Sequence, residues 1–232
     1  MRLLWQQIPS TIISELYCNS DFDGVVIDTE HSPFNNETLF SCIQVVKGYN
    51  KKCYVRLAHL DKIVTKMCLD AGCDGIIFST VESKKQAQEM IDYCRYPVFG
   101  GKRGQGLCRE NKWGESDLGR HRPDVIAQIE TKDGVDNLND IMECDFDMYL
   151  IGPYDLSASL GCVEDFDNPK YIEYINKISD NIPKEKLGIH LPKDVEKHYP
   201  NYKDYGFTAL GMDTTLLIEK VKEIIKCKIL KT

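Results

Sequence analysis

The chain has 232 residues, of which 42% are hydrophobic and 28% are charged, and its formal net charge is −7. This composition is typical of an ordinary globular protein and disfavours a nucleic-acid surface, because neutralising phosphates requires clustered Lys and Arg. No apolar run is long enough to span a membrane, and the first residues lack the features of a signal peptide. We therefore expect a cytosolic (cytoplasmic) protein with no membrane or nucleic-acid partner.

Short apolar runs alternate along the chain with stretches of helical spacing. The expected strands cover 3–6, 24–29, 53–57, 75–81, 125–131, 148–152, 187–191 and 208–212. The expected helices cover 9–18, 35–47, 61–71, 83–94, 135–143, 170–181, 193–199 and 215–228, with Asn35, Asp61 and Ser83 as caps. Eight such pairs within ~250 residues are typical of a single α/β domain, a (β/α)8 TIM barrel over 1–232. An open doubly wound sheet remains an alternative, since it gives a similar local pattern.

One long irregular segment, 96–124, follows the fourth strand and helix pair, and it contains several glycines together with Arg103 and Arg109. We expect it to cover the carboxyl ends of the strands. The chain also has ten cysteines but no Cys-x2-Cys spacing, so reduced cysteines packed in the core are favoured over zinc ligands or disulfides. Cys108, in a polar stretch, is the one we expect to be exposed.

Two acidic residues follow neighbouring strands at the point where each strand ends. Glu130 ends the run 125–131, and Asp155 follows 148–152. Ligands of parallel sheets and barrels bind at these carboxyl ends. Two carboxylates suit Mg²⁺, Mn²⁺ or Co²⁺, because such a cation needs few protein ligands when substrate and water supply the rest. Glu130 and Asp155 are therefore candidate metal ligands.

The other expected strands also end in polar residues, namely Asp28, Glu30 and His31 after the second, Arg56 in the third, Gln128 in the fifth, His190 in the seventh and Asp213 after the eighth. Strand alternation places Asp28 with Glu30, and Gln128 with Glu130, on the inward face. Buried carboxylates without partners are costly, which favours a bound cation. The alternative is a layer of internal salt bridges in which Arg56 pairs with Glu30 or Glu130.

Several motifs occur in order along nearly the whole chain: Asp28 to Pro33 (DTEHSP), Val55-Arg56, Leu69 to Gly72 (LDAG), Val81-Glu82-Ser83, Arg95-Tyr96-Pro97, Arg103-Gly104, Gln128 to Thr131 (QIET) and Ile151 to Ser157 (IGPYDLS). Together they resemble the HpcH/HpaI family of class II pyruvate-type aldolases. The resemblance implies a TIM barrel of the phosphoenolpyruvate/pyruvate superfamily type, usually a hexamer. It also implies a metal-dependent carbon–carbon lyase that acts on a 2-oxo acid, pyruvate or oxaloacetate, and an aldehyde.

The resemblance further implies a role for each matching residue. Glu130 and Asp155 would hold the metal, and Arg56 would contact the pyruvate or its enolate. His31 and Asp70 would form a general acid/base pair. The substrate would also contact Gln128, Gly152, Pro153 and Tyr154, with Asp28 and Glu30 supporting these groups from behind. Since Asp70 ends the third expected helix, at the far end of the barrel from His31, it would have to come from a neighbouring subunit.

Other reactions remain open on the same barrel. Relatives with similar pockets decarboxylate oxaloacetate or condense it with an acyl thioester. A barrel that only binds a 2-oxo acid is another possibility, although binding alone would not need His31. A Schiff-base mechanism would need a desolvated Lys at a strand end. Lys132 and Lys193 are the candidates, and we expect both to be solvated residues at helix starts.

Overall fold

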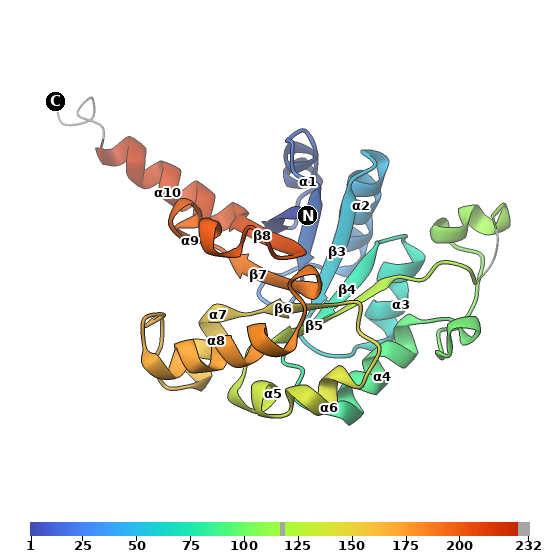
Figure 1. Cartoon of the computed structure of the whole chain (residues 1–232). Coiled ribbons are helices and arrows are strands. Elements are labelled where there is room, and N and C mark those ends of the chain that lie inside the picture. Colours follow the sequence, from blue (N-terminus) through green and yellow to red (C-terminus); the bar gives the residue numbers. More distant parts are fainter. Residues whose placement is uncertain (117–118, 227–232) are drawn as a thin grey trace.

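Eight parallel strands form a closed barrel in which each strand pairs with the next and β8 pairs with β1 (Figure 1). The computed structural model describes residues 1–116 and 119–226. The strands are β1 (Arg2–Gln6), β2 (Gly24–Asp28), β3 (Lys52–Leu57), β4 (Gly75–Phe78), β5 (Asp124–Ile129), β6 (Met148–Ile151), β7 (Leu187–Leu191) and β8 (Phe207–Met212). All eight lie where the sequence predicts strands. The TIM-barrel prediction is confirmed, and the open-sheet alternative is wrong.

Helices surround the barrel between the strands (Figure 1). They are α1 (Thr11–Cys18), α2 (Asn36–Gly48), α3 (Lys62–Asp70), α4 (Lys84–Cys94), α5 (Lys132–Asp136), α6 (Leu138–Met142), α7 (Pro153–Ser159), α8 (Pro169–Asn181), α9 (Val195–Tyr202) and α10 (Asp213–Lys226), with 3₁₀ turns at Pro97–Phe99, Arg109–Gly114 and Lys184–Lys186. The three predicted caps are confirmed: the side chains of Asn35, Asp61 and Ser83 each accept a backbone N–H of the first turn.

The helix predictions differ from the structure at two main places. The predicted helix 135–143 is two short helices, α5 and α6, which meet at Asn137. The sequence did not predict α7, which begins with Pro153 directly after β6; proline suits this first position because its missing N–H has no partner there anyway. The last two residues of the predicted helix 215–228 lie outside the described residues.

The interior of the barrel changes from apolar to polar along the strands. On the amino side, the interior is filled by a separate apolar cluster, formed by Leu3, Trp5, Val26, Tyr54, Ile77, Ile126, Leu150, Phe207 and Ala209. Two residues further along their strands, the inward positions hold buried polar side chains instead: Asp28, Arg56, Ser79 and Gln128. The carboxyl ends of the strands therefore form a polar mouth above an apolar floor.

The long segment between α4 and β5 lies at the amino ends of the strands, so the prediction that it covers the carboxyl ends is wrong. Arg103, buried in this segment, donates from Nη2 to Asp70 Oδ1 at 2.9 Å, and Arg109 Nη1 donates to the Ala71 carbonyl at 2.7 Å. Both acceptors are at the end of α3. A connection from a helix to the next strand always returns to the amino end of a parallel barrel.

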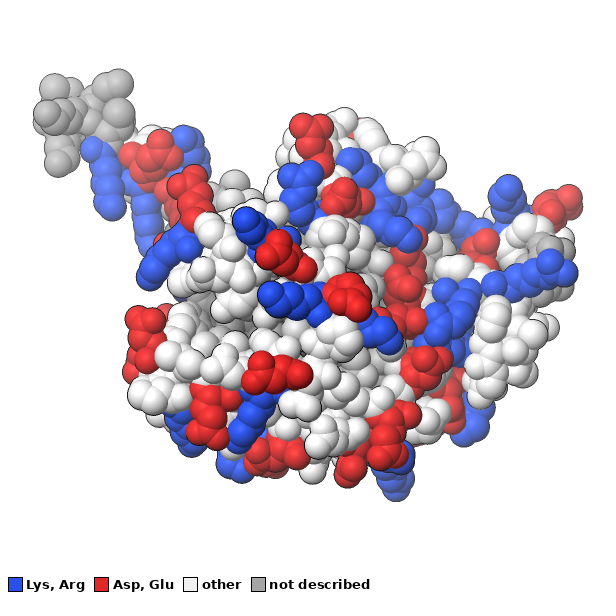
Figure 2. All heavy atoms as spheres, in the orientation of Figure 1, with Lys and Arg blue, Asp and Glu red and all other residues white. Residues whose placement is uncertain are grey.

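The described cysteines are all free, as predicted, and Cys108 is buried, so its predicted exposure is wrong. Asn111 explains the burial, because its side chain bonds both the backbone N–H and the sulfur of Cys108. Acidic and basic side chains intermix over the face drawn in Figure 2. Within the described residues, none of the helices has the length and apolar character needed to cross a bilayer.

Candidate active site

Arg56 is the central cation of the barrel mouth. Its Nε and Nη2 donate to the two carboxylate oxygens of Asp28, at 2.8 and 2.7 Å, and its Nη1 lies 2.7 Å from Glu30 Oε2. The pairing of β2 with β3 places Asp28 directly beside Arg56, which allows the two-pronged contact. The salt bridge to Glu30 is one of those that the alternative reading of the sequence proposed. The result is a guanidinium held in one orientation at the mouth.

Asp28 is fully buried and ionised. Burial alone would raise its pKa, but the hydrogen bonds and charge of Arg56 outweigh burial and lower the pKa from 3.8 to about 2. A bond from Gln7 Nε2 at 3.1 Å and one from the backbone of Glu30 act in the same direction. Because the pKa of Asp28 is lower in the folded protein than in the unfolded chain, its ionised form stabilises the fold. This stabilisation is complete above the pKa of the unfolded chain and is lost as the pH falls through the pKa of the folded protein.

We expect Asp28→Asn to lower the free energy of unfolding at pH 7 by about 2 kcal/mol, the size of the pKa shift in energy. Urea unfolding at pH 7 and pH 3 measures this. The difference in the free energy of unfolding between variant and wild type should shrink at pH 3, because at that pH the wild type has already lost part of the stabilisation that Asp28 provides. The exposed Asp140→Asn serves as a control with little effect. An equal loss at both pH values would show that the charge of Asp28 is not its source.

Glu130 is buried at the mouth, and its hydrogen bonds come from uncharged donors. Its Oε1 accepts from the backbone N–H of Thr80 at 2.7 Å and from the Thr80 hydroxyl at 3.0 Å, while Gln128 donates from Nε2 to Oε2. Burial, and then the charges of Glu30 and Asp155, raise the pKa of Glu130 from 4.5 to about 7. A cation bound here would relieve this repulsion.

Thr80 is a site residue that the sequence reasoning missed. It has a φ of 53°, in the left-handed region that β-branched residues rarely adopt. This conformation accompanies the two hydrogen bonds that it donates to Glu130. The signal was the polar pair Ser79-Thr80, which interrupts an apolar run where the fourth strand ends. Ser79 also takes part, since its hydroxyl donates to Glu30 Oε1 at 2.9 Å.

Gly152 lets the chain that follows β6 approach Glu130 closely. A Cβ on Gly152 would lie 2.5 Å from Glu130 Oε2 and 3.0 Å from Gln128 Nε2, so no larger residue fits without movement. Asp155 follows on the first turn of α7, where its side chain is exposed. Asp155 therefore follows its strand, as expected, but it lies on a helix that the sequence did not predict.

The donor set fits a hard divalent cation. Among residues 1–116 and 119–226, no group of three or more His, Cys, Asp or Glu side chains is arranged to hold a metal, so Glu130 and Asp155 would be the protein's only carboxylate ligands from the described residues. Two carboxylates leave most of an octahedral shell to water and to substrate oxygens, an arrangement common for Mg²⁺. Gln128 Oε1 is also buried without a hydrogen-bond partner in the described structure, so one more oxygen is free to meet a ligand.

The structure places His31 and Asp70 at opposite ends of one barrel. His31 lies in the loop after β2, with its side chain 60% exposed and its Nε2 4.0 Å from Glu30 Oε2. Asp70 ends α3 on the amino side, where Arg103 and Lys66 both pair with its carboxylate. A single chain therefore does not bring the two together.

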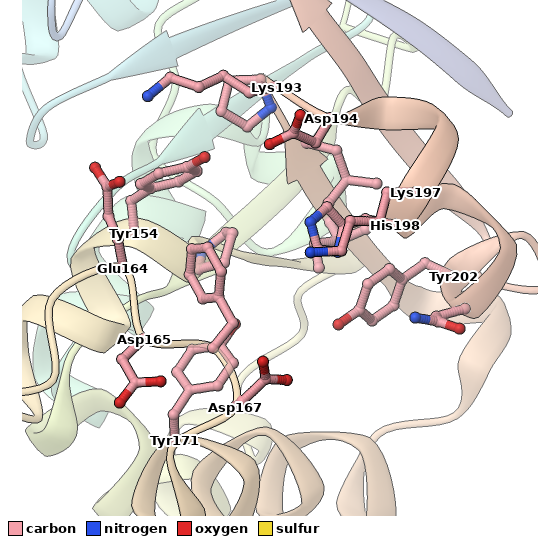
Figure 3. A pocket seen from close by; sticks show the side chains of 16 residues that line it. Tyr154, Glu164, Asp165, Asp167, Tyr171, Lys193, Asp194, Lys197, His198 and Tyr202 are labelled. Atoms are coloured by element: carbon pink, nitrogen blue, oxygen red, sulfur yellow. The ribbon is translucent and has the colours of Figure 1, made fainter.

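A cavity of about 620 Å³ lies beside the mouth, between α7, α8 and α9 (Figure 3). Pro153 and Tyr154 line it, whereas Glu130, Asp155 and Arg56 do not. The Tyr154 ring packs edge-on against Phe166 at 5.3 Å and lies 5.5 Å from Lys193 Nζ. Tyr154 thus belongs to the side cavity, and Lys193 is exposed at its rim, as predicted for a solvated residue.

The family model described as HpcH/HpaI aldolase/citrate lyase matches residues 2–220. The 4-hydroxy-2-oxo-heptane-1,7-dioate aldolase of Salmonella paratyphi C (strain RKS4594) is 30% identical over 225 residues, which cover 92% of this chain and 84% of the relative.

Two solved structures share the fold. An HpcH/HpaI aldolase/citrate lyase family protein from Burkholderia cenocepacia J2315 has a TM-score of 0.88 at 22% identity, covering 100% of this chain and 95% of the other. The citrate synthase SbnG has a TM-score of 0.85 at 23% identity, covering 99% and 93%.

The match over most of the chain confirms the family resemblance that the sequence motifs indicated. It also confirms that the protein is an enzyme, a class II aldolase of the lyase type. The chain forms a closed barrel, and its buried carboxylates lie at the carboxyl ends of the strands, where enzymes with this fold have their active sites. The chain belongs to the HpcH/HpaI aldolase/citrate lyase family.

Proposed function

We propose that the enzyme uses Mg²⁺, Mn²⁺ or Co²⁺, held by Glu130 and Asp155, to cleave or form 4-hydroxy-2-oxo acids from pyruvate and an aldehyde. The observation that carries this is a buried carboxylate, Glu130, repelled by two others and lacking a charged partner among its hydrogen bonds. The Salmonella relative is named for a substrate of this chemical class.

Arg56 is the residue that would stabilise the developing charge. When bound, the metal withdraws electron density from the 2-oxo acid. Arg56 is oriented by Asp28 and Glu30, so its position is set before the reaction begins, and a fixed donor of this kind is worth ~10²–10³ in rate. Gln128 and the close approach at Gly152 shape the remainder of the 2-oxo acid site.

His31 would move the proton in cleavage. It takes the proton from the 4-hydroxyl, the C3–C4 bond breaks, and the electron pair passes to C3 and the 2-oxo oxygen as the pyruvate enolate. The aldehyde leaves, and a proton added at C3 completes pyruvate. His31 suits this role because its imidazole is exposed at the mouth, where it can meet the 4-hydroxyl of a bound substrate.

We also propose a homo-oligomer, a hexamer by family resemblance, in which Asp70 of one subunit meets His31 of the next. Helix α10 supports assembly because it extends away from its own barrel (Figure 1) and exposes 43–61% of each of six apolar side chains: Leu216, Leu217, Ile218, Val221, Ile224 and Ile225. Such a helix is covered in most stable proteins, and a second copy of this chain supplies a cover of matching length.

A cytoplasmic location fits the same proposal. The described cysteines are all free and mostly buried, as expected for a protein that folds and works in a reducing compartment.

Decarboxylation of oxaloacetate is the second candidate, together with its condensation with an acyl thioester. The similarity in fold to the citrate synthase SbnG supports condensation as an alternative, although the aldolase relative is more similar in sequence. Incubating pyruvate and Mg²⁺ or Mn²⁺ with a panel of aldehydes, and detecting 4-hydroxy-2-oxo acids by mass, decides for the aldolase. Release of CO₂ from oxaloacetate without any adduct decides for the second candidate.

The roles of Arg56 and His31 can be separated by two reactions. Arg56→Lys should reduce both aldol cleavage and deuterium entry at the pyruvate methyl by ~10²–10³, because both pass through the enolate. His31→Ala should reduce cleavage more than exchange, since its proton belongs to the 4-hydroxyl. Proton NMR follows exchange, and a coupled assay follows cleavage. Equal losses of the two reactions in both variants would contradict this division.

A further inference from the structure

Gln7 directly follows β1 at the mouth of the barrel and bonds the buried carboxylate that holds Arg56. Its side-chain Nε2 donates to Asp28 Oδ2 at 3.1 Å. The pairing of β1 with β2 places Gln6 beside Ile27, so the residues that come next, Gln7 and Asp28, are neighbours at the mouth. Because β1 and β3 both pair with β2, Gln7 and Arg56 reach Asp28 from the strands on either side of it.

Each oxygen of the Asp28 carboxylate accepts one bond from Arg56 and one from a neighbouring part of the barrel. Oδ1 accepts from Arg56 Nε at 2.8 Å and from the backbone N–H of Glu30 at 3.0 Å. Oδ2 accepts from Arg56 Nη2 at 2.7 Å and from Gln7 at 3.1 Å. The two bonds from Arg56 fix the paired groups only relative to each other, and the terminal torsion of an aspartate side chain is soft. The bonds from Glu30 and Gln7 therefore fix the plane of the carboxylate within the barrel.

Gln7 is itself held by the first turn of α10. Its Oε1 accepts from the Thr214 hydroxyl at 3.0 Å, and its backbone N–H lies 3.0 Å from both carboxylate oxygens of the buried Asp213. A neutral amide suits its two side-chain partners, because the NH₂ group meets a carboxylate and the oxygen meets a hydroxyl. A glutamate of the same size would instead place a second negative charge next to Asp28. Gln7 therefore joins the start of α10 to the Asp28 carboxylate.

The orientation of the Arg56 guanidinium matters for the reaction proposed above. The 2-oxo oxygen gains negative charge as the enolate forms, and a donor stabilises that charge best when it is already in place. A displacement of ~1 Å of a reacting or orienting group can cost ~10²-fold in rate. We propose that Gln7 is a positioning residue for the aldol reaction, which orients Arg56 through the Asp28 carboxylate. This inference rests on the proposed function, from which it takes the role of Arg56.

Gln7→Leu tests the proposal, because leucine fills a similar space without a polar group. In the Mg²⁺-loaded protein, kcat for deuterium entry at the pyruvate methyl should fall by ~10-fold, while KM for pyruvate should change by less than ~2-fold. The reason is that a misplaced Arg56 weakens stabilisation of the enolate more than binding of the uncharged 2-oxo group. Gln44→Leu, the same change at an exposed position of α2, should leave both values unchanged.

Gln7→Glu gives a second readout, which a merely structural role would not move. The charged groups around this position are Asp28, Asp213 and, bonded to Asp28, Arg56. The introduced carboxyl repels Asp28 when it is ionised, whereas its protonated form can donate to Asp28 as the amide does. The ratio of variant to wild-type exchange rate should therefore rise by ~3-fold or more as the pH falls from 9 to 6. The same ratio for Gln7→Leu should stay constant.

Three results would overturn the proposal. Normal exchange in Gln7→Leu that is folded by circular dichroism would show that Arg56 needs no such anchor. A rise in KM with kcat unchanged would show that Gln7 contacts the substrate instead. A Gln7→Glu ratio that does not vary with pH would show that charge next to Asp28 has no effect on the reaction.

A second pair of variants decides the matter if Gln7→Leu does not fold. Thr214→Val removes the hydroxyl that orients the Gln7 amide and should lower kcat by ~3-fold, whereas Thr214→Ser keeps the hydroxyl and should retain the wild-type rate. Equal rates in these two variants would also overturn the proposal. Exchange in wild type separates the two proposals: its absence refutes the proposed function and the inference with it, whereas normal exchange in both wild type and Gln7→Leu refutes only the role of Gln7.

Discussion

Removal of divalent metal is expected to abolish aldol cleavage, and Mg²⁺, Mn²⁺ or Co²⁺ is expected to restore it. Glu130→Gln and Asp155→Asn should each stay inactive at any metal concentration tested, with losses of about 10³ or more, because the cation carries the main electrostatic stabilisation of the enolate. Turnover in a chelator titration, together with calorimetric metal binding, measures both effects.

The same variants should keep their fold. Glu130 is buried beside Glu30 and Asp155, which raise its pKa, so a neutral Gln removes a repulsion in the metal-free protein. Thermal unfolding of metal-free Glu130→Gln should therefore begin no earlier than that of wild type at pH 8. Glu143→Gln, an exposed change at the end of α6, is the matched control. Full activity after complete chelation, or a borohydride-trapped adduct with pyruvate, would contradict a metal-dependent mechanism.

Two inactive variants are expected to restore activity when their subunits exchange. His31→Ala and Asp70→Ala should each lose ~10²–10⁴ of the cleavage rate if the two residues act as an acid/base pair. In an equal mixture, about a quarter of the sites would combine an intact His31 with an intact Asp70 from the next subunit of a symmetric assembly. The mixed sample should recover activity on that scale, measured after exchange.

The control for this experiment is a mixture of His31→Ala with the double variant, in which no site regains both residues. Mass spectrometry of differently tagged subunits confirms that exchange has taken place. No recovery despite exchange would contradict a shared site. A monomer by sedimentation at the assay concentration would do the same, and Asp70 would then be a helix-end residue held by Arg103 and Lys66.

The local features of this protein could be predicted from its sequence. Asn35, Asp61 and Ser83 cap helices because a short polar side chain satisfies N–H groups only a few residues away. The eight apolar runs became the eight strands, since a short buried run between polar stretches has few other ways to bury its surface. The same logic places Glu130 and Asp155 beyond the carboxyl ends of β5 and β6.

The contacts that give these residues their chemistry depended on closure of the barrel. The alternation of Asp28, Glu30 and Arg56 indicated inward faces, but only the β2 and β3 register decided that Asp28 is the principal partner of Arg56. The stack of Trp5 on His190 joins residues far apart in the chain that become neighbours when β8 pairs with β1. Spacing along a chain does not encode such distances.

Chain direction decided the position of the segment 96–124. Its glycines and arginines indicated a loop, but the loop lies at the amino end because it leads from a helix into β5. Thr80 shows the same limit at one residue, since its positive φ and its bonds to Glu130 arise from the packing of β4 against β5. Local propensity thus determined the elements, while the burial and charge that raise the pKa of Glu130 exist only in the folded barrel.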